Sequence, residues 1–428
     1  MGNNENKKVV KNAVWLTIFQ FANYIIPMLI IPYISHKLGV LNFGKVTYIQ
    51  NIANYATILV NFSFEYSTTK EIALYKNDRE KLGQIFWNTI TIKSVLLLVT
   101  ALIFIPYSIA AANSQEEVTM YIAAWIINIG WCLYPSWYFQ GTEKMGVMSI
   151  TNFLIKLTGA ILIVTCVRSE NDSSTYLVTY SLPYILGAVS TLYYCIKKEN
   201  VITKSPDKEG IIYLLKKSSP IFIANLFSSI TPTLALTLVG ASKLNPLDIG
   251  YFSGAYKIIF AILAITNVPV SMAIFPKLTR EFAQSKEAGI RYFRKSLIIV
   301  IAYSTAISLL TYLFAPLAVK ILLGARFLMS IEYLRAYSTA PLLCTTALFL
   351  TVQGLYAMNR QNIAFAISII TLTVCFTLTN EFIESIGAQG AAYAYLIAEA
   401  LEIAISGSIV HYYNNKILTV SSGKQKES

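Results

Sequence analysis

The sequence predicts an all-α integral membrane protein with about twelve transmembrane helices, arranged as two six-helix lobes related by pseudo-two-fold symmetry. Of its 428 residues, 55% are hydrophobic and only 13% are charged, which lies outside the usual range of water-soluble proteins. The apolar residues gather in about twelve runs of roughly 20 residues, the length that a helix needs to cross a bilayer. Short motifs also recur in the same order in the two halves, which indicates an internal duplication.

Six candidate spans lie in the first half of the chain. The first span follows the basic residues Lys7, Lys8 and Lys11. It is too long for the core of a signal peptide and lacks a small-residue cleavage site, so we expect it to be retained as a membrane span. The six spans are Ala13–Ile34, Val46–Phe64, Trp87–Tyr107, Met120–Phe139, Val147–Val167 and Tyr176–Ile196.

Six further spans follow in the second half. The two sets are separated by a basic segment, residues 201–218, which contains Pro206 and Gly210 and which we interpret as a cytoplasmic linker. The predicted domains are therefore an N-terminal lobe of residues 1–200 and a C-terminal lobe of residues 219–428. The second set of spans is Pro220–Val239, Phe252–Phe275, Leu297–Ala315, Ala336–Met358, Ile363–Leu378 and Ala391–Tyr412.

Most basic residues lie between the apolar runs. With the N-terminus placed in the cytoplasm, 24 of the 34 Lys and Arg residues fall in cytoplasmic segments and 7 fall outside. Because cytoplasmic loops carry such an excess, we expect both termini to be cytoplasmic. The net charge of +12 is thereby explained by membrane orientation, and no nucleic-acid partner is expected.

The two halves share three sequence correspondences in the same order. Each half holds an even number of spans, so both cross the membrane in the same direction. Parallel repeats of this kind are a transporter architecture, with a substrate path between the lobes; the alternative is an inert helical bundle that descends from a duplication. The corresponding segments are Leu38–Gly44 and Leu244–Gly250, Thr69–Ala73 and Thr279–Ala283, and Gln140-Gly141 and Gln353-Gly354.

Three lysines lie inside apolar runs: Lys93, Lys156 and Lys257. A cation in the middle of a bilayer costs about 3 kcal/mol on insertion scales, and such residues usually face a water-filled cavity. Asn152 lies one helical turn before Lys156, which is the deepest of the three in its span. We therefore expect a hydrated, partly cationic cleft that binds an anionic, polar substrate. The alternative for Lys93 and Lys257 is that they snorkel to a membrane surface.

Other polar residues inside the spans form stripes at helical spacing. Asn23 and Asn54 belong to two such stripes in the first two spans. Their amides are expected either to contact the substrate or to hold neighbouring helices together. Glu399 and Glu402 lie on one face of the last span and are candidates for a proton- or sodium-coupling site. The alternative is that they neutralise a lysine on a neighbouring helix.

Several kinds of chemistry are not expected. The five cysteines have no paired spacing, and the chain holds only two histidines, so neither a disulfide framework nor a metal site is predicted. No nucleotide-binding loop of the Gly-x-x-x-x-Gly-Lys-Ser/Thr type occurs, so ATP is not expected to drive the protein directly. We expect no cofactor, and a proton or sodium gradient is left as the energy source.

Four segments carry a resemblance to a known family: Pro32–Gly39, Thr69–Ala73, Trp137–Met145 and Phe275–Leu278. Together they closely resemble the Wzx-type polysaccharide flippases, which belong to the same superfamily (MOP) as the multidrug and toxic compound extrusion (MATE) exporters. The resemblance covers essentially the whole chain. Its most specific part is the Trp-Tyr-Phe-Gln-Gly-x-Glu stretch that begins at Trp137.

The resemblance implies a MATE-like fold and a transport function. It implies that an undecaprenyl-diphosphate-linked oligosaccharide is moved from the cytoplasmic to the outer leaflet of a bacterial inner membrane by alternating access. Such transfer serves O-antigen, capsule or exopolysaccharide assembly, where a polysaccharide polymerase is an expected partner. The substrate-binding residues would then be Lys156, Lys93, Lys257, Asn152, Asn23 and Asn54, and the ion-coupling residues Glu399 and Glu402.

Two other functions are alternatives. A drug or small-molecule exporter of the same superfamily would share the spans and the duplication, but it would be expected to line its cleft with carboxylates rather than lysines. A membrane enzyme, such as a polysaccharide polymerase or ligase, would be expected to carry its catalytic groups on a long outer loop. The longest outer connections are only about 12 to 20 residues, which argues against an enzyme.

Overall fold

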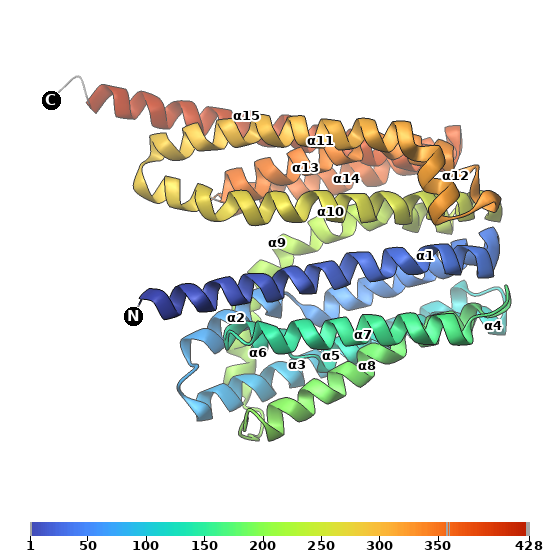
Figure 1. Cartoon of the computed structure of the whole chain (residues 1–428), viewed down its shortest axis with the longest axis horizontal. Coiled ribbons are helices and arrows are strands. Elements are labelled where there is room, and N and C mark those ends of the chain that lie inside the picture. Colours follow the sequence, from blue (N-terminus) through green and yellow to red (C-terminus); the bar gives the residue numbers. More distant parts are fainter. Residues whose placement is uncertain (1, 357, 359, 425–428) are drawn as a thin grey trace. The chain divides into compact units, whose positions relative to one another are not determined.

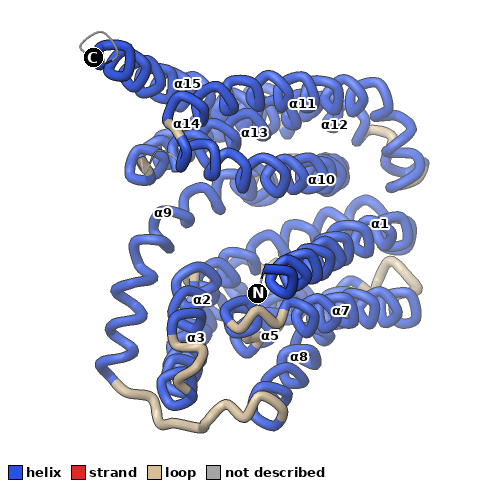
Figure 2. Tube along the Cα trace, turned by 60° about the vertical axis from the view of Figure 1, so that its left-hand side comes forward, coloured by secondary structure: helices blue, strands red, loops and turns tan. Residues whose placement is uncertain are grey.

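The computed structural model of the chain describes residues 2–356, 358 and 360–424. All regular elements in these ranges are helical (Figures 1 and 2). Most side chains before Ile25, all of those after Asn414, and those of Phe275 and Pro276 lie outside the described part. The predictions that involve Lys7, Lys8, Lys11 and the first two residues of the Phe275–Leu278 motif therefore lie outside it too.

The chain divides into two packed units, Met1–Leu226 (unit 1) and Phe227–Ser428 (unit 2). Helix α9, Lys208–Ala241, contributes to both. The other helices of unit 1 are α1 Gly2–Asn61, α2 Phe64–Leu74, α3 Arg79–Ala111, α4 Gln115–Trp125, α5 Ile127–Leu133, α6 Ser136–Gly141, α7 Met145–Cys166 and α8 Ser173–Lys197.

Unit 2 contains two long helices, a broken segment and two more long helices. The broken segment includes short 3-10 helices and a π-helix, η3, whose wider turns make one hydrogen bond to the fifth residue back. Its elements are α10 Pro246–Gln284, α11 Lys286–Leu322, η1 Ala325–Phe327, α12 Ser330–Ala336, η2 Tyr337–Thr339, α13 Ala340–Leu348, η3 Phe349–Tyr356, α14 Gln361–Ile386 and α15 Ala388–Lys424.

Ten segments of the described chain are long and apolar enough to cross a membrane. One of them, Ile25–Leu74, contains both of the first two predicted spans. The sixth predicted span forms helix α8 but is not among the ten. Counting the double segment twice and adding α8 accounts for all twelve predicted spans, which confirms the predicted all-helical membrane fold.

The first two spans follow one another inside α1 without a loop. Gly39 divides them, with φ 69° and ψ 176°, a backbone conformation that essentially only glycine adopts. In unit 2 the corresponding residue is Asn245, whose φ is −59°. Its side chain accepts a hydrogen bond from the backbone N–H of Leu247 at 2.9 Å and so caps α10. The same junction is built by a glycine in one unit and by a helix cap in the other.

A second difference lies between α1 and α2, where Phe62 (φ 43°) and Ser63 (φ 56°) both adopt the left-handed region. Non-glycine residues there cost on the order of 1 kcal/mol each or more and persist when neighbours hold them. Phe222 of α9 stacks on Phe62 with ring centroids 4.3 Å apart, and Asn225 donates to Ser63 Oγ at 3.4 Å. In unit 2, α10 passes the corresponding position as a continuous helix.

The beginning of α9 is fixed to unit 1 by Asp207. Its carboxylate accepts hydrogen bonds from Asn88 Nδ2 and from the backbone N–H of Gly210, both at 2.7 Å. These bonds, with that from Asn88 first, hold the pKa of Asp207 below its usual range. About two turns further along α9, Lys217 forms an ion pair with the buried Glu71 of α2, and Ser218 and Ser67 share a 2.6 Å hydrogen bond. Residues 207–218 of the predicted linker are thus held in unit 1 by specific contacts.

The fourth span of each unit is broken rather than straight. In unit 1 it consists of α4, α5 and α6, with Pro135 directly before α6. In unit 2 it consists of α12, η2, α13 and η3. The repeated Gln-Gly pair ends α6 at Gly141 and lies inside η3 at Gly354. The repeated Gln-Gly pair therefore lies in the last element of the broken fourth span in both units.

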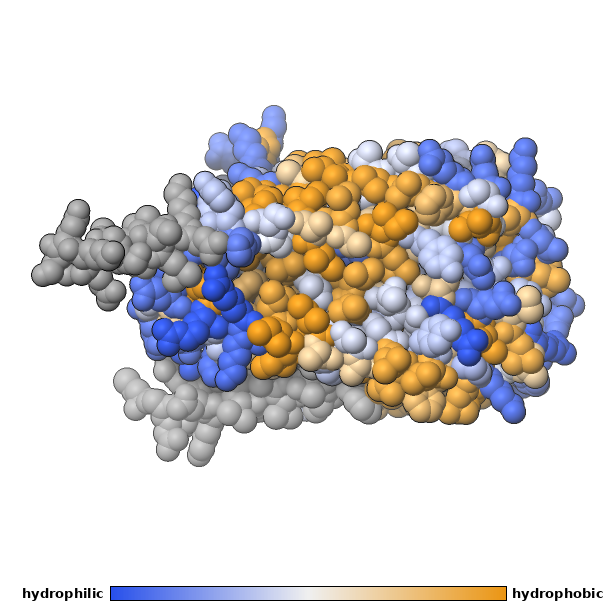
Figure 3. Space-filling model, turned by 90° about the horizontal axis from the view of Figure 1, so that it is seen from above, coloured by the Kyte–Doolittle hydropathy of each residue, from blue (hydrophilic) through white to orange (hydrophobic). Residues whose placement is uncertain are grey.

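The visible surface has the distribution of residues that a membrane protein needs. The face in Figure 3 shows a central apolar band with hydrophilic residues at both ends. On α11, the exposed side chains of this kind include Ile298, Leu309, Leu313, Leu317 and Ile321. Large exposed apolar surfaces are rare on soluble monomers, so this band is the expected contact with lipid.

Candidate substrate-binding site

Lys93 lies on α3 and is 2% exposed, so it does not point into lipid. Its Nζ donates to the backbone carbonyl of Trp131 on α5 at 2.6 Å and to Asn61 Oδ1 at 3.3 Å. A buried ammonium needs such acceptors because its desolvation is otherwise too costly. In this conformation Lys93 is enclosed by its own unit, and it stabilises the position of Trp131.

Lys156 lies on α7 and is half-buried. Its Nζ donates to the hydroxyl of Tyr184 on α8 and lies 4.9 Å from the centre of the Tyr184 ring. A cation over an aromatic face is attracted by the ring's negative charge density. Among the lysines predicted to bind substrate in unit 1, Lys156 is the one whose side chain retains accessible surface.

Trp131 connects the two lysines. Its carbonyl accepts from Lys93, and its indole ring lies 5.7 Å from the ring of Tyr184, which in turn contacts Lys156. Asn61, Lys93, Trp131, Tyr184 and Lys156 therefore form a continuous polar and aromatic group, which we call the lysine–aromatic group. Helices α1, α3, α7 and α8 and the broken fourth span contribute to it, so residues that are distant in sequence become neighbours.

The predicted amide residues fall into two groups. Asn152, one turn before Lys156, donates from Nδ2 to Asn23 Oδ1 at 3.1 Å, so this pair joins α7 to α1 close to the lysine–aromatic group. Asn54 is exposed on α1 and does not belong to that group. Of its neighbours along the same stripe, Asn61 belongs to the group through its contact with Lys93, whereas Gln50 donates to the Tyr176 hydroxyl on α8 at 3.4 Å.

Unit 2 contains the two predicted carboxylates. Glu399 is buried on α15, with Tyr395 and Cys344 beside it, and the Cys344 Sγ and Tyr395 hydroxyl lie 3.2 Å apart. Glu402 is half-buried one turn along, near Thr351 of η3. Lys257 is half-buried on α10, within the same unit. Two carboxylates in low dielectric repel one another when both are ionised, so such a pair favours uptake of a cation.

Sequence reasoning missed Trp131 and Tyr184, and also Tyr180, whose ring centroid lies 5.9 Å from that of Tyr184. The tyrosines could have been found, since Tyr176, Tyr180 and Tyr184 recur every fourth residue in one predicted span. Trp131 could not, because its role depends on a contact of its backbone carbonyl with α3. Among the residues that the structure describes, no group of three or more His, Cys, Asp or Glu side chains could hold a metal ion.

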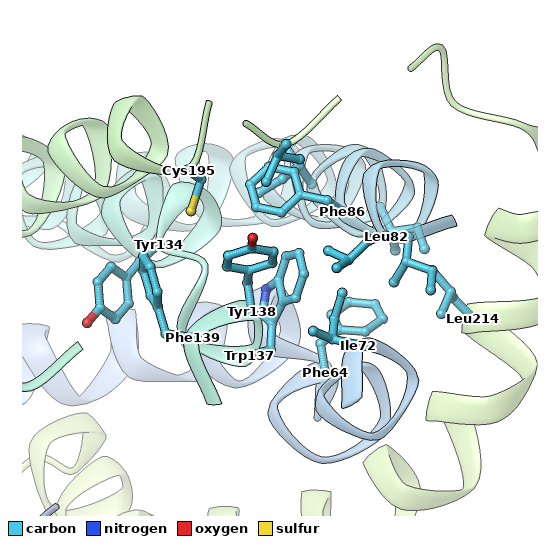
Figure 4. Packing of buried hydrophobic residues seen from close by; sticks show 14 of the residues in the cluster. Phe64, Ile72, Leu82, Phe86, Tyr134, Trp137, Tyr138, Phe139, Cys195 and Leu214 are labelled. Carbon is cyan, nitrogen blue, oxygen red and sulfur yellow. The ribbon is translucent and has the colours of Figure 1, made fainter. Parts of the chain in front are cut away.

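The most specific sequence motif, which begins at Trp137, lies in a hydrophobic core. Figure 4 shows Trp137 and Tyr138 between Phe86 on one side and Ile72 on the other. The Trp137 ring lies 5.3 Å from Phe86. The cluster draws on helices α2, α3, α6, α7, α8 and α9, and Trp137 and Phe139 are fully buried.

Gly141 explains why this motif contains a glycine. A Cβ atom there would lie 2.6 Å from Cβ of Ile72 and 2.8 Å from the carbonyl oxygen of Thr69. The absence of a side chain lets α6 pack directly on α2. The motif therefore stabilises the packing of unit 1.

Comparison with known proteins identifies relatives over nearly the whole chain. The family model described as polysaccharide biosynthesis protein matches residues 9–282. A protein named as an O-antigen transporter in Escherichia coli K12 is 25% identical, over 97% of this chain and 99% of its own length. A protein of the same name from Shigella dysenteriae is 26% identical, over 91% of this chain and 97% of its own.

Solved structures share the fold at low sequence identity. An inward-facing multidrug resistance MATE transporter of the MOP superfamily has a TM-score of 0.70 and 14% identity, covering 96% of this chain and 99% of its own. The lipid II flippase MurJ, in an inward closed conformation, has a TM-score of 0.71 and 15% identity, covering 94% and 87%. The predicted MATE-like fold is confirmed, and the chain belongs to the polysaccharide biosynthesis protein family of multi-pass membrane proteins.

Proposed function

We propose that this protein moves an undecaprenyl-diphosphate-linked oligosaccharide from the cytoplasmic to the outer leaflet of a bacterial inner membrane. The observation that carries the proposal is Lys156, a cation inside a membrane-spanning helix that retains accessible surface and is surrounded by hydroxyl, amide and aromatic side chains. The names of the E. coli and Shigella relatives, both O-antigen transporters, support this substrate class. The similarity of the fold to that of MurJ, a lipid II flippase, supports the proposal that this fold can flip a lipid-linked substrate.

The physical problem of such transport is the polar head group. Each unpaired hydroxyl that enters hydrocarbon costs several kcal/mol, so an oligosaccharide does not cross a bilayer unaided. A polar site inside the protein removes most of this cost, while the polyprenyl tail stays in lipid. Alternating exposure of the site to the two sides of the membrane then completes the transfer.

The residues of unit 1 divide this work. Lys156 contacts the diphosphate directly, because an ammonium forms strong, charge-assisted hydrogen bonds with phosphate oxygens. Lys93 acts indirectly. Its ammonium group, which donates to the Trp131 carbonyl, contributes positive electrostatic potential and fixes the position of the α5 backbone. Asn152 and Asn23 bind the sugar hydroxyls. Asn54 of unit 1 and Lys257 of unit 2 are further substrate contacts in other stages of transport.

Energy comes from an ion gradient rather than from a cofactor. Glu399 and Glu402 form the coupling site for a proton or sodium ion, since their proximity disfavours a doubly ionised state. Both termini face the cytoplasm, as the distribution of basic residues predicts. A polysaccharide polymerase in the same membrane is the expected consumer of the flipped product, and no catalytic step is assigned to this chain.

Complementation tests the proposal. The gene is expressed in strains of defined O-antigen that lack their own flippase, and the surface glycan is analysed. We expect surface O-antigen with the wild-type chain and its loss with Lys156→Ala. Normal export by Lys156→Ala at equal protein abundance would contradict the role of Lys156, and no export by the wild-type chain in any tested strain would contradict the function.

Ion-coupled export of drugs or other small molecules is the second candidate. It is favoured by the carboxylate pair of unit 2 and by the similarity to MATE transporters. Drug-resistance assays in a strain that lacks its major exporters separate the two functions. Resistance that requires Glu399, without any effect on surface glycan, would favour this alternative.

A further inference from the structure

Four aromatic rings form a row inside unit 1. Tyr176, Tyr180 and Tyr184 occupy every fourth position of α8, and their successive ring centroids are 6.1 Å and 5.9 Å apart. Trp131 extends the row beyond Tyr184 with a spacing of 5.7 Å. We call these four residues the aromatic ladder. Because a helix rises about 1.5 Å per residue, the three tyrosines span roughly 12 Å, comparable with a short oligosaccharide.

The ladder lies on the side of α8 that faces away from lipid. The most exposed apolar residues of the helix follow the opposite side, at Val178, Leu182, Leu186 and Val189, each 40% exposed or more. Tyr180 and Tyr184 are only half-buried, although they face the interior of a membrane protein. Rings that served packing alone would be expected to be enclosed on all sides, as Trp137 and Phe139 are in the core of the same unit.

Polar groups lie at both ends of the row of three tyrosines. Lys156 donates to the Tyr184 hydroxyl at one end, and Gln50 donates to the Tyr176 hydroxyl at 3.4 Å at the other. The ladder is therefore a row of mutually tilted aromatic rings with a cation, hydroxyl groups and an amide beside it. This combination matches a ligand with an anionic group at one end. Attached to that group would be a chain of rings that carry polar groups but have apolar faces.

We infer that the aromatic ladder is the subsite for the sugar part of the substrate, an inference that rests on the proposed function. A pyranose ring presents C–H groups on its face, and these carry partial positive charge that is attracted to the negative face of an aromatic ring. The equatorial hydroxyls then bond to Gln50 and the tyrosine hydroxyls. With the diphosphate at Lys156, the first sugars lie over Tyr184 and Tyr180. The ladder thereby distinguishes a glycan-bearing lipid from the bare lipid diphosphate.

Binding to the full-length protein in lipid nanodiscs tests this inference with two probes. One probe is undecaprenyl diphosphate, and the other is the same lipid carrying a trisaccharide. We expect the wild-type protein to bind the trisaccharide probe more tightly. Tyr180→Leu is expected to weaken binding of this probe up to about tenfold, the loss of one ring contact, and to leave the bare lipid unchanged.

Two variants serve as matched controls. Tyr180→Phe keeps the ring and is expected to retain most of the preference for the trisaccharide probe, while Tyr193→Leu alters an exposed tyrosine of α8 outside the ladder and is expected to change neither affinity. Equal wild-type affinity for the two probes, or equal loss of both in Tyr180→Leu, overturns the ladder but leaves the proposed function intact. A wild-type protein that binds neither probe overturns the proposed function itself.

Discussion

The two units share one order of helices but differ in the charge that they enclose. Both have a broken fourth span at the repeated Gln-Gly pair. Unit 1 encloses Lys93 and Lys156 among amides and aromatic rings, whereas unit 2 contains the carboxylates Glu399 and Glu402 together with the half-buried Lys257. The two units therefore keep the same order of helices, while their interior side chains and the backbone at the span junctions differ. We interpret this difference as a division of labour, with an anion site in one unit and a cation site in the other.

The largest expected effect comes from removing the charge of unit 1. Lys156→Met is expected to weaken binding of undecaprenyl diphosphate by about ten- to a hundredfold, the value of a hydrogen bond to a charged group. Glu399→Gln is expected to leave this affinity unchanged and to abolish the response of transport to an imposed ion gradient. Lys76→Met, at an exposed position outside the group, is the control. Equal loss of lipid binding in both test variants would refute the division of labour.

The ion pair between α2 and α9, in which Glu71 is buried and the Lys217 side chain is 37% exposed, is expected to give the next largest effect. Lys217→Met removes the charged donor from the buried Glu71 carboxylate and leaves it the Tyr213 hydroxyl at 3.4 Å, so it should lower the free energy of unfolding by about 2–3 kcal/mol. Glu71 corresponds to the half-buried Glu281 of unit 2. Glu281→Gln should change stability by less than about 0.5 kcal/mol. Denaturant titration of the purified protein measures the change in the free energy of unfolding for both variants. Similar values would show that the ion pair of Lys217 and Glu71 does not stabilise unit 1 specifically.

The junction at the start of the second span in each unit gives a matched pair of smaller effects. Gly39→Ala places a side chain in a conformation that essentially only glycine adopts, at a cost of about 2 kcal/mol. Asn245→Ala removes only a helix cap and should cost about 1 kcal/mol. Thermal unfolding midpoints should therefore fall more for Gly39→Ala, and the reverse order would contradict our account of the kink.

The repeated Gln-Gly pair provides a second matched comparison. An added Cβ at Gly141 meets Ile72 and Thr69 at under 3 Å, whereas at Gly354 its closest neighbour is Val410 Cγ2, a side-chain end, at 3.0 Å. Gly141→Ala should destabilise the protein by about 2 kcal/mol and Gly354→Ala by less than about 1 kcal/mol. Unfolding in detergent measures the difference in stability between the two variants. Equal loss of stability in both would show that α6 is not closely packed against α2 at Gly141.

The smallest effect concerns pH. The hydrogen bonds from Asn88 and Gly210 lower the pKa of Asp207, so its stabilisation is present above the pKa of the unfolded chain and is lost as pH falls through the lowered pKa. Asp207→Ala should cost about 1 kcal/mol at neutral pH and less in acid. Ser285 caps α11 in unit 2 with a neutral hydroxyl, so the cost of Ser285→Ala should not vary with pH. A pH-independent cost of Asp207→Ala would show that its charge is irrelevant.

The membrane fold could be predicted because its signals are local. Hydropathy and the repeats are read along the chain, and the twelve spans follow from them. The contacts of the lysines could not be predicted in the same way. Helical periodicity places Asn54 and Asn61 near one face of a helix, but only packing decides that Asn61 contacts Lys93 while Asn54 is exposed.

The role of the most specific motif was also beyond the sequence. Its pattern identified relatives but gave no indication that Trp137 and Gly141 pack α6 against α2 and α3. The predicted boundary of the linker could not reveal that Lys217 would join Glu71 across 146 positions, because such pairing arises only when distant helices meet. Long-range contacts of this kind carry most of the information about the site.

The burial of Trp137 has a consequence for how cargo is inferred in this family. A signature that is enclosed in the core is maintained by packing, so it reports family membership rather than the substrate. If the proposed function holds, substrate specificity depends on other residues, and these should be sought at partly accessible positions of α8 such as Tyr180.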